Sequence, residues 1–216
     1  MTPDDQPRLT PPVLMLVTDR HLAGSEHALL RAVDEAIDGG VNAVQLREKD
    51  MRPADLLPLA CRLREVTEGR ALLLVNGPLA VALEAGADGV HLPEDAEPPP
   101  PPWTFTWGRS VHSAEAAFMA MGEAPRHLIL GPIYHTPSHP DATPAGLALI
   151  REIAPITRVP LVAIGGITPA NARDVMQAGA HGIAVISAIL GSDDPCAAAQ
   201  ALAKAFEFLP IRKLFP

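Results

Sequence analysis

Two loops near the C-terminal end of the chain have the residue types that can hold a phosphate. Gly165 and Gly166 follow the short apolar run Leu161–Ile164, and Ser187 follows a second such run, Gly182–Ile186. Loops of this kind that lead into helices offer backbone N–H groups to phosphate oxygens. We therefore predict a phosphate site on these two loops, with a plain strand-to-helix turn at the paired glycines as the alternative.

The elements that position these loops belong to a regular alternation of strands and helices. Short apolar runs bounded by Gly or Pro predict buried parallel strands, and apolar residues at helical spacing predict the helices between them. The predicted strands are Val13–Thr18, Asn42–Leu46, Ala71–Val75, Asp88–His91, Phe105–Val111, His127–Leu130, Leu161–Ile164 and Gly182–Ile186. The predicted helices are Glu26–Ile37, Pro53–Val66, Pro78–Glu84, Ala114–Met121, Ala145–Ala154, one that begins at Thr168-Pro169, and Pro195–Phe208.

Eight strands in this order predict an α/β chain with a single (β/α)8 TIM barrel, because a doubly wound sheet rarely needs so many units. We expect the barrel over residues 13–208, between a disordered N-terminal tail of residues 1–12 and a C-terminal tail of residues 209–216. The run Pro98–Pro102 is interpreted as a stiff spacer between the fourth and fifth strands. Function in this fold is located at the C-terminal ends of the strands, and polar side chains follow almost every strand here.

Length, charge and composition limit the classes of function. The chain has 216 residues, 48% of them hydrophobic, and a net charge of -8 with scattered basic residues, so we expect no nucleic-acid partner. No run approaches the roughly 20 apolar residues of a membrane span, and the N-terminus has no signal-peptide features, which predicts a cytoplasmic protein without a membrane partner. Cys61 and Cys196 are expected to stay thiols. Barrels of this size often self-associate, so a homo-oligomer is an alternative that stays open.

A series of segments in the right order makes the chain resemble the thiamine phosphate synthase and TenI superfamily over nearly all of residues 13–206. The matching segments are Val17-Thr18-Asp19, Gly40-Val41 with Gln45–Lys49, Gly86–Leu92, Gly108–Ser113, Gly131–Tyr134 with Thr136, Ala163–Ile167 and Ala184–Ile189. The resemblance implies a barrel that binds a small-molecule thiazole phosphate. We place the ligand contacts on Gln45, Arg47, Lys49, Asn76, Ser110, Thr136, Gly165, Gly166, Ile186 and Ser187.

The resemblance implies two alternative chemistries. A synthase joins an aminopyrimidine diphosphate to a thiazole phosphate, with magnesium holding the pyrophosphate. A TenI-like tautomerase aromatises a carboxythiazole phosphate by proton transfer and needs no metal. Three departures from the synthase pattern favour the tautomerase: Gly77 replaces a magnesium-binding aspartate, the segment before Asp95 is one residue short, and His139 replaces a lysine.

We therefore expect an isomerase of the TenI branch that acts in thiamine biosynthesis without a cofactor. The first alternative is a thiamine phosphate synthase, a transferase that would use Mg²⁺ with Asp95 as the remaining metal ligand. The second alternative is a non-catalytic protein that binds a thiazole phosphate or regulates other enzymes.

The tautomerase needs an acid/base group, which the resemblance would place directly after Gly131. That position is Pro132, which cannot transfer a proton. His135 and His139 in the same loop, and His112 after the fifth strand, are the candidates, because the unperturbed pKa of histidine lies near operating pH. The loop from residue 137 to residue 143 is expected to act as a lid.

Some of these polar residues have a structural alternative. Gln45 and Arg47 alternate toward the barrel interior, where such side chains can also serve as plugs between packed layers. His91 is interpreted as a hydrogen-bonded structural histidine rather than a catalyst. His127 begins a strand, on the face of the barrel associated with stability, and is also interpreted as structural.

Overall fold

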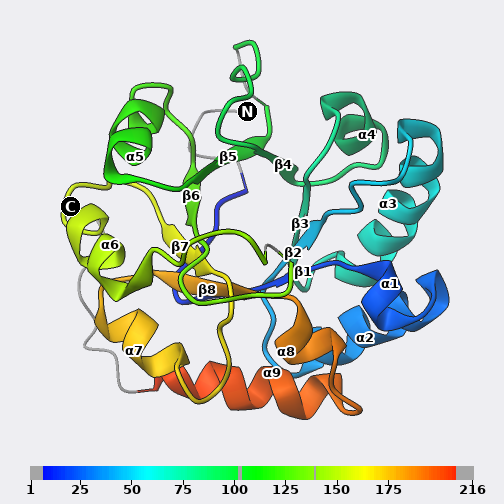
Figure 1. The fold of residues 1–216 in the computed structure, drawn as a ribbon. Coiled ribbons are helices and arrows are strands. Elements are labelled where there is room, and N and C mark those ends of the chain that lie inside the picture. The colour runs from blue at the N-terminus through cyan, green and yellow to red at the C-terminus, as the bar shows by residue number, and fades with distance from the viewer. Residues whose placement is uncertain (1–6, 102–103, 139, 208–216) are drawn as a thin grey trace.

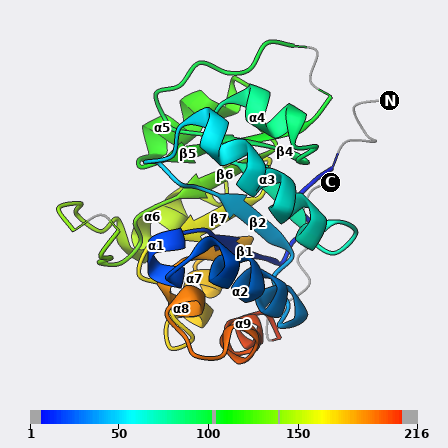
Figure 2. The same cartoon turned by 90° about the vertical axis from the view of Figure 1, so that its right-hand side faces the viewer.

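The computed structural model describes residues 7–101, 104–138 and 140–207 as a closed barrel of parallel strands surrounded by helices (Figures 1 and 2). The strands are β1 (Val13–Val17), β2 (Ala43–Leu46), β3 (Leu72–Val75), β4 (Gly89–Leu92), β5 (Thr106–Val111), β6 (His127–Leu130), β7 (Leu161–Ile164) and β8 (Gly182–Val185). Each strand pairs in parallel with its neighbours in sequence, and β1 pairs with β8 to close the ring. The predicted TIM barrel is confirmed.

The helices lie outside this ring (Figure 1). They are α1 (Arg20–Ala23), α2 (Glu26–Asp38), α3 (Pro53–Thr67), α4 (Leu79–Glu84), α5 (Ala114–Met121), α6 (Gly146–Ile153), α7 (Ala172–Gln177), α8 (Ser187–Leu190) and α9 (Pro195–Ala203), followed by the short 3-10 helix η2 (Lys204–Phe206). Between β4 and β5 the described residues form no helix, which agrees with the proline spacer. Within the described ranges, no helix is long and apolar enough to cross a membrane.

Apolar side chains pack in two shells, one between strands and helices and one inside the barrel. The inner shell contains Val13, Met15 and Val17 of β1, which pack with residues from β2, β3, β6, β7 and β8. Leu9 belongs to the same shell and is only 5% exposed. Leu9 precedes β1, which begins at Val13 as predicted, and its side chain packs against the inner shell. Residues 1–6 and 208–216, which include the predicted C-terminal tail, lie outside the described ranges.

One predicted helix start is wrong. Thr168 and Pro169 precede α7 rather than begin it, because α7 starts at Ala172. The side chain of Asn171 explains the difference: its Oδ1 accepts a hydrogen bond from Thr168 N, and its Nδ2 donates to the carbonyl of Gly166. These bonds hold the segment as a turn that ties the helix to the loop after β7. The short helices α1 and α8 were not anticipated from the sequence.

Two buried histidines occupy the barrel interior. His127 of β6 is 0% exposed and His91 of β4 is 1% exposed. Burial lowers the pKa of His127 to about 3 and lowers the pKa of His91 well below its ordinary value. The His127 ring has room because Gly108 of β5 lies beside it, where an added Cβ would come within 2.1 Å of His127 Nε2. Both residues are therefore neutral parts of the packed core.

Neutral burial of His127 predicts a fold that is sensitive to acid. Its pKa is about 3 in the folded protein and about 6.5 in the unfolded chain. Between these values the unfolded chain binds more protons, so the free energy of unfolding falls as the pH drops below the unfolded pKa. From pH 7 to pH 5, His127 alone should remove about 2 kcal/mol of stability.

Urea unfolding at pH 7, 6 and 5 measures this dependence. The variant His127→Gln should show a smaller loss between pH 7 and pH 5 than the wild type. His27→Gln is the matched control because His27 is exposed, and its pH dependence should equal that of the wild type. Equal pH dependence for wild type and His127→Gln would contradict the assignment.

Candidate active site

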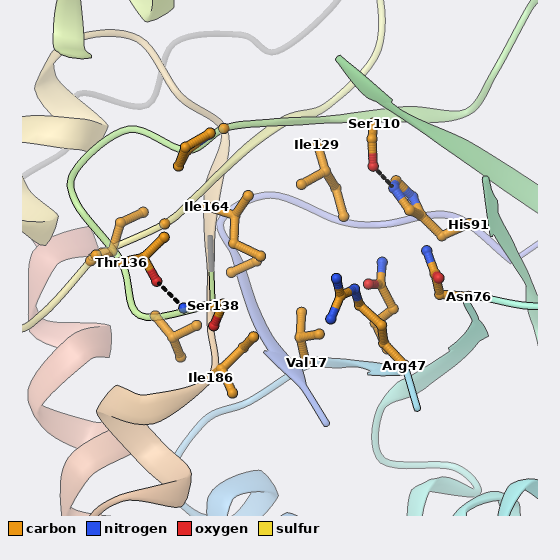
Figure 3. A pocket seen from close by; sticks show the side chains of 18 of the residues that line it. Val17, Arg47, Asn76, His91, Ser110, Ile129, Thr136, Ser138, Ile164 and Ile186 are labelled. Atoms are coloured by element: carbon orange, nitrogen blue, oxygen red, sulfur yellow. Dashed lines mark hydrogen bonds between the residues drawn. The ribbon is translucent and has the colours of Figure 1, made fainter. Parts of the chain in front are cut away.

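A cavity of about 240 Å³ opens at the C-terminal ends of the strands (Figure 3). Its wall brings together most of the side chains and loops expected from the sequence: Gln45, Arg47, Lys49, Asn76, Ser110, His112, Thr136, Gly165, Gly166, Ile186 and Ser187. His135 and Asp95 are exposed and do not line this cavity. His139 lies outside the described residues.

One end of the cavity is formed by the loops after β6, β7 and β8. Gly165 has φ +102° and Gly166 has φ +64°, backbone conformations that L side chains rarely adopt. A Cβ on Gly166 would also lie 2.4 Å from the carbonyl oxygen of His135. The N–H groups of Gly166 and Ser187 donate no hydrogen bond to another described residue. This end therefore offers free N–H donors of the kind that bind a phosphate.

The other end of the cavity carries two cations. Figure 3 shows Arg47 and Asn76 on the side opposite Thr136 and Ile186. Neither the Arg47 guanidinium nor the Lys49 ammonium makes an ion pair or hydrogen bond within the described part of the chain. Burial lowers the pKa of Arg47, and the nearby charge of Arg47 lowers the pKa of Lys49. Two partly desolvated cations that repel each other form a site for an anion.

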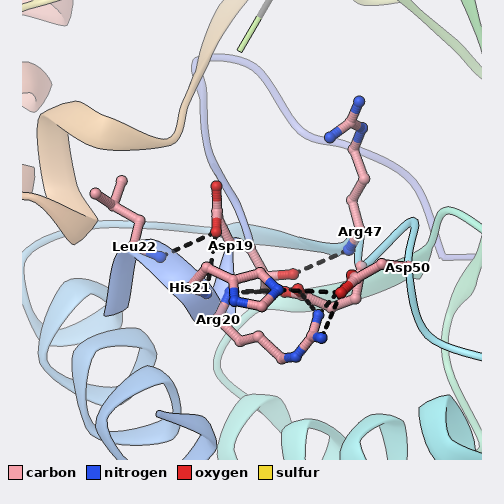
Figure 4. Close-up of polar contacts among 8 residues, drawn as sticks. Asp19, Arg20, His21, Leu22, Arg47 and Asp50 are labelled. Carbon is pink, nitrogen blue, oxygen red and sulfur yellow. Dashed lines mark hydrogen bonds and ion pairs between the residues drawn. The ribbon is translucent and has the colours of Figure 1, made fainter. Parts of the chain in front are cut away.

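The segment after β2 carries acidic and basic side chains that point to different sides. Figure 4 shows the Arg47 side chain pointing away from the contact between Arg20 and Asp50. Glu48 and Asp50 point away from the cavity and both pair with Arg20 of α1, at 3.1 Å and 2.5 Å. This contact also holds the pKa of the Asp50 carboxyl below its ordinary value. The chain turns at Lys49 and Asp50, and Arg47 and Lys49 are left on the cavity wall. Arg47 lines the open cavity, which fits a ligand contact better than a side chain packed between the layers of the barrel interior.

Glu94 is a carboxylate on the cavity wall that the sequence interpretation missed. Its Oε2 accepts from both the backbone N–H and Nδ1 of His112, at 2.7 Å and 2.9 Å. The buried Arg109 fixes the loop that carries it, donating from Nη1 to the carbonyls of Pro93, Glu94 and Ala96. The sequence signalled an altered loop through the shortened segment before Asp95, but not which acid reaches the wall.

The floor of the cavity is apolar and was also missed. It is formed by inward-facing side chains of the strands, namely Val17, Ile129, Ile164 and Ala184. Ser138, from the loop expected to be a lid, lies on the wall as well. The described residues contain no group of three or more His, Cys, Asp or Glu side chains that could hold a metal without help from a ligand.

Comparisons with known proteins decide the family. The family model described as thiamine monophosphate synthase matches residues 14–189. The chain belongs to this family. The thiamine-phosphate synthase of Methanoculleus marisnigri is 44% identical over 200 residues, which cover 88% of this chain and 92% of the relative. The thiamine-phosphate synthase of Roseiflexus castenholzii is 40% identical over 197 residues, with 88% and 86% covered.

A solved structure agrees with this membership. The thiamine phosphate pyrophosphorylase of Pyrococcus furiosus superposes with a TM-score of 0.81 at 35% identity, covering 90% of this chain and 95% of that one. The synthase names of these relatives contradict the expected TenI-like tautomerase and its isomerase class, and they favour the first alternative. The prediction compared positions one at a time and missed Glu94, a carboxylate on the same cavity wall.

The glycine requirement at position 166 can be tested directly. Gly166→Ala should weaken binding of inorganic phosphate by about tenfold or more, because the methyl group displaces the loop after β6 and the donor at this position. Gly69→Ala is the matched control, since Gly69 also has a positive φ, +70°, but has no atom within 4 Å of an added Cβ. Gly69→Ala reports the cost of the positive φ alone, and isothermal titration with phosphate should show wild-type affinity for it. Equal phosphate affinity in the two variants would contradict the site.

Proposed function

We propose that the protein is a thiamine phosphate synthase, which joins an aminopyrimidine diphosphate to a thiazole phosphate and releases pyrophosphate. The observation that carries this proposal is one cavity with two separate anion-binding ends: Arg47 and Lys49 at one, and the loops of Gly166 and Ser187 at the other. Two anionic substrates need two such ends. The synthase names of relatives at 40% identity or more support the same reaction.

The reaction makes one bond and breaks one. A C–N bond forms between the pyrimidine methylene carbon and the thiazole nitrogen, and the C–O bond to the diphosphate breaks with its electron pair leaving on oxygen. The protein has little covalent chemistry to perform, so its contribution is to position both substrates and to stabilise charge on the leaving diphosphate. Arg47 and Lys49 supply that charge, and Gly166 and Ser187 anchor the thiazole phosphate at the opposite end.

The donors on the wall fit a magnesium ion bound together with a diphosphate. Mg²⁺ is usually held by one or two carboxylates plus substrate phosphates. Glu94 provides one carboxylate: His112 occupies its Oε2, and Oε1 accepts no hydrogen bond from a described residue. The amide oxygen of Asn76 is a second oxygen donor on the wall. When bound, Mg²⁺ neutralises charge on the diphosphate oxygens.

His112 thereby has a different role from the one expected. It orients Glu94 and serves no proton transfer in this proposal. The acid/base roles considered for His135 and His139 belonged to the tautomerase and are not carried over.

The proposal is tested by mixing purified protein with both substrates and Mg²⁺ and converting thiamine phosphate to fluorescent thiochrome. Product should form, and a chelator should stop its formation. No product, with a known synthase active under the same conditions, would overturn the proposal and leave a non-catalytic binder of thiazole phosphate as the alternative.

Removing the cation at position 47 should affect one substrate only. Arg47→Met should raise the KM for the diphosphate by about ten- to a hundredfold, the value of one or two charged hydrogen bonds, and leave the KM for the thiazole phosphate nearly unchanged. Arg52→Met is the control, because Arg52 is exposed and pairs with Asp55 on α3. An equal rise in both KM values would show that Arg47 supports the fold rather than the diphosphate.

The carboxylate at position 94 should govern metal binding. Glu94→Gln keeps the size of the side chain but removes its charge, and should raise the Mg²⁺ concentration for half-maximal rate by about tenfold or more. The control is Asp95→Asn, the adjacent exposed acid off the wall, which should behave like the wild type. Mn²⁺ binding in the presence of inorganic pyrophosphate, followed by electron paramagnetic resonance, gives a second measurement. The reverse ranking of the two variants would assign the metal to Asp95.

A further inference from the structure

A hydrogen-bonded chain runs from the cavity into the barrel core. Ser110 Oγ lies 2.9 Å from His91 Nε2, and His91 Nδ1 lies 3.2 Å from His127 Nε2. Ser110 and His91 line the cavity, whereas His127 lies behind them and does not. Figure 3 shows the Ser110 hydroxyl and the His91 ring pointing toward each other at the edge of the cavity. His127 is thus connected to the ligand only through the other two residues.

Only two proton arrangements satisfy this chain. Both histidines are neutral because burial lowers their pKa values, so each ring carries one N–H. In the first arrangement, His127 Nε2–H donates to His91 Nδ1, and His91 Nε2–H donates to Ser110 Oγ. In the second, the Ser110 hydroxyl donates to His91, and His91 Nδ1–H donates to His127. The two differ in whether Ser110 offers a proton or a lone pair to the cavity.

The inner end of the chain distinguishes the two arrangements. His127 Nδ1 is buried and has no hydrogen-bond partner among the described residues. The second arrangement would place the His127 proton on this nitrogen and leave an N–H buried without an acceptor, which native structures rarely tolerate. The first leaves a bare ring nitrogen there. It also uses the Nε2–H form, which is the more populated tautomer of free neutral histidine.

We infer that His127 is a positioning residue that holds His91 in its Nε2–H form and so directs the Ser110 hydroxyl proton into the cavity. In this arrangement the Ser110 hydroxyl can donate a hydrogen bond to an anionic oxygen of the ligand. The second arrangement would instead turn the lone pairs of Ser110 toward that negative charge. His91 lies beside Asn76, on the same side of the cavity as Arg47 (Figure 3). That Ser110 donates to the diphosphate there rests on the proposed function.

The tautomers are measured by ¹H–¹⁵N correlation of the histidine rings in ligand-free protein, with His91→Gln and His127→Gln used for assignment. Both rings should be neutral and protonated at Nε2. Protonation at Nδ1 in either ring, or a charged ring at neutral pH, would overturn the inference. This measurement needs no turnover, so it decides the inference even if the synthase reaction is not observed.

Two substitutions at position 127 test the consequence for the reaction. His127→Leu removes the donor and should lower kcat/KM for the diphosphate by about tenfold, the value of one oriented hydrogen bond, with the KM for the thiazole phosphate unchanged. His127→Gln retains an amide N–H at the position of Nε2 and should recover most of the loss. Thermal melting of both variants checks that they are folded. Equal losses in the two, or a rise in both KM values, would reduce His127 to a packing residue.

Discussion

Closure of the barrel between β1 and β8 is the constraint on which the site depends. The register pairs Val13 with Gly182, and a Cβ on Gly182 would come within 2.5 Å of both the Cβ and the carbonyl oxygen of Val13. Only a residue without a side chain allows the two strands to meet there. Because β8 also pairs with β7, closure brings the loops of Gly166 and Ser187 together on the same side of the mouth. The β7–β8 pairing places these two loops side by side, and closure through β1 completes the cavity wall around them.

The opposite end depends on how charge is divided along one segment. The acids at positions 48 and 50 are neutralised by Arg20, and the cations at 47 and 49 are left without partners in the described structure. Two neighbouring cations repel each other in the free protein, as the lowered pKa of Lys49 beside Arg47 indicates, and an anionic ligand relieves this repulsion. Relief of this repulsion therefore favours binding of the diphosphate at this end of the cavity in the proposed reaction.

The sequence was sufficient to predict the barrel, because each buried strand appears as a short apolar run and parallel strands place their C-terminal ends together. The same reasoning placed Gln45, Asn76 and Ser110 correctly at one cavity. It failed where position depends on contacts that are distant in sequence. The packing of Leu9 against the inner shell of the barrel is one such contact.

The acidic residue of the site was missed for a related reason. Glu94, not Asp95, reaches the wall because Arg109 of β5 holds the carbonyls of that loop. Counting residues from the end of β4 cannot reveal such a contact. The expected chemistry was wrong for a related reason, since the missing aspartate at Gly77 was judged without knowing that Glu94 lies on the cavity wall.

The most direct test of the account is ³¹P nuclear magnetic resonance of the protein with both substrates and Mg²⁺. The two diphosphate signals of the pyrimidine substrate should be replaced by the single signal of inorganic pyrophosphate, with twice the intensity of the signal of thiamine phosphate because the products form in equal amounts. Loss of the diphosphate without thiamine phosphate, or unchanged spectra under conditions in which a known synthase turns over, would contradict the assignment of two anion-binding ends to one coupling reaction.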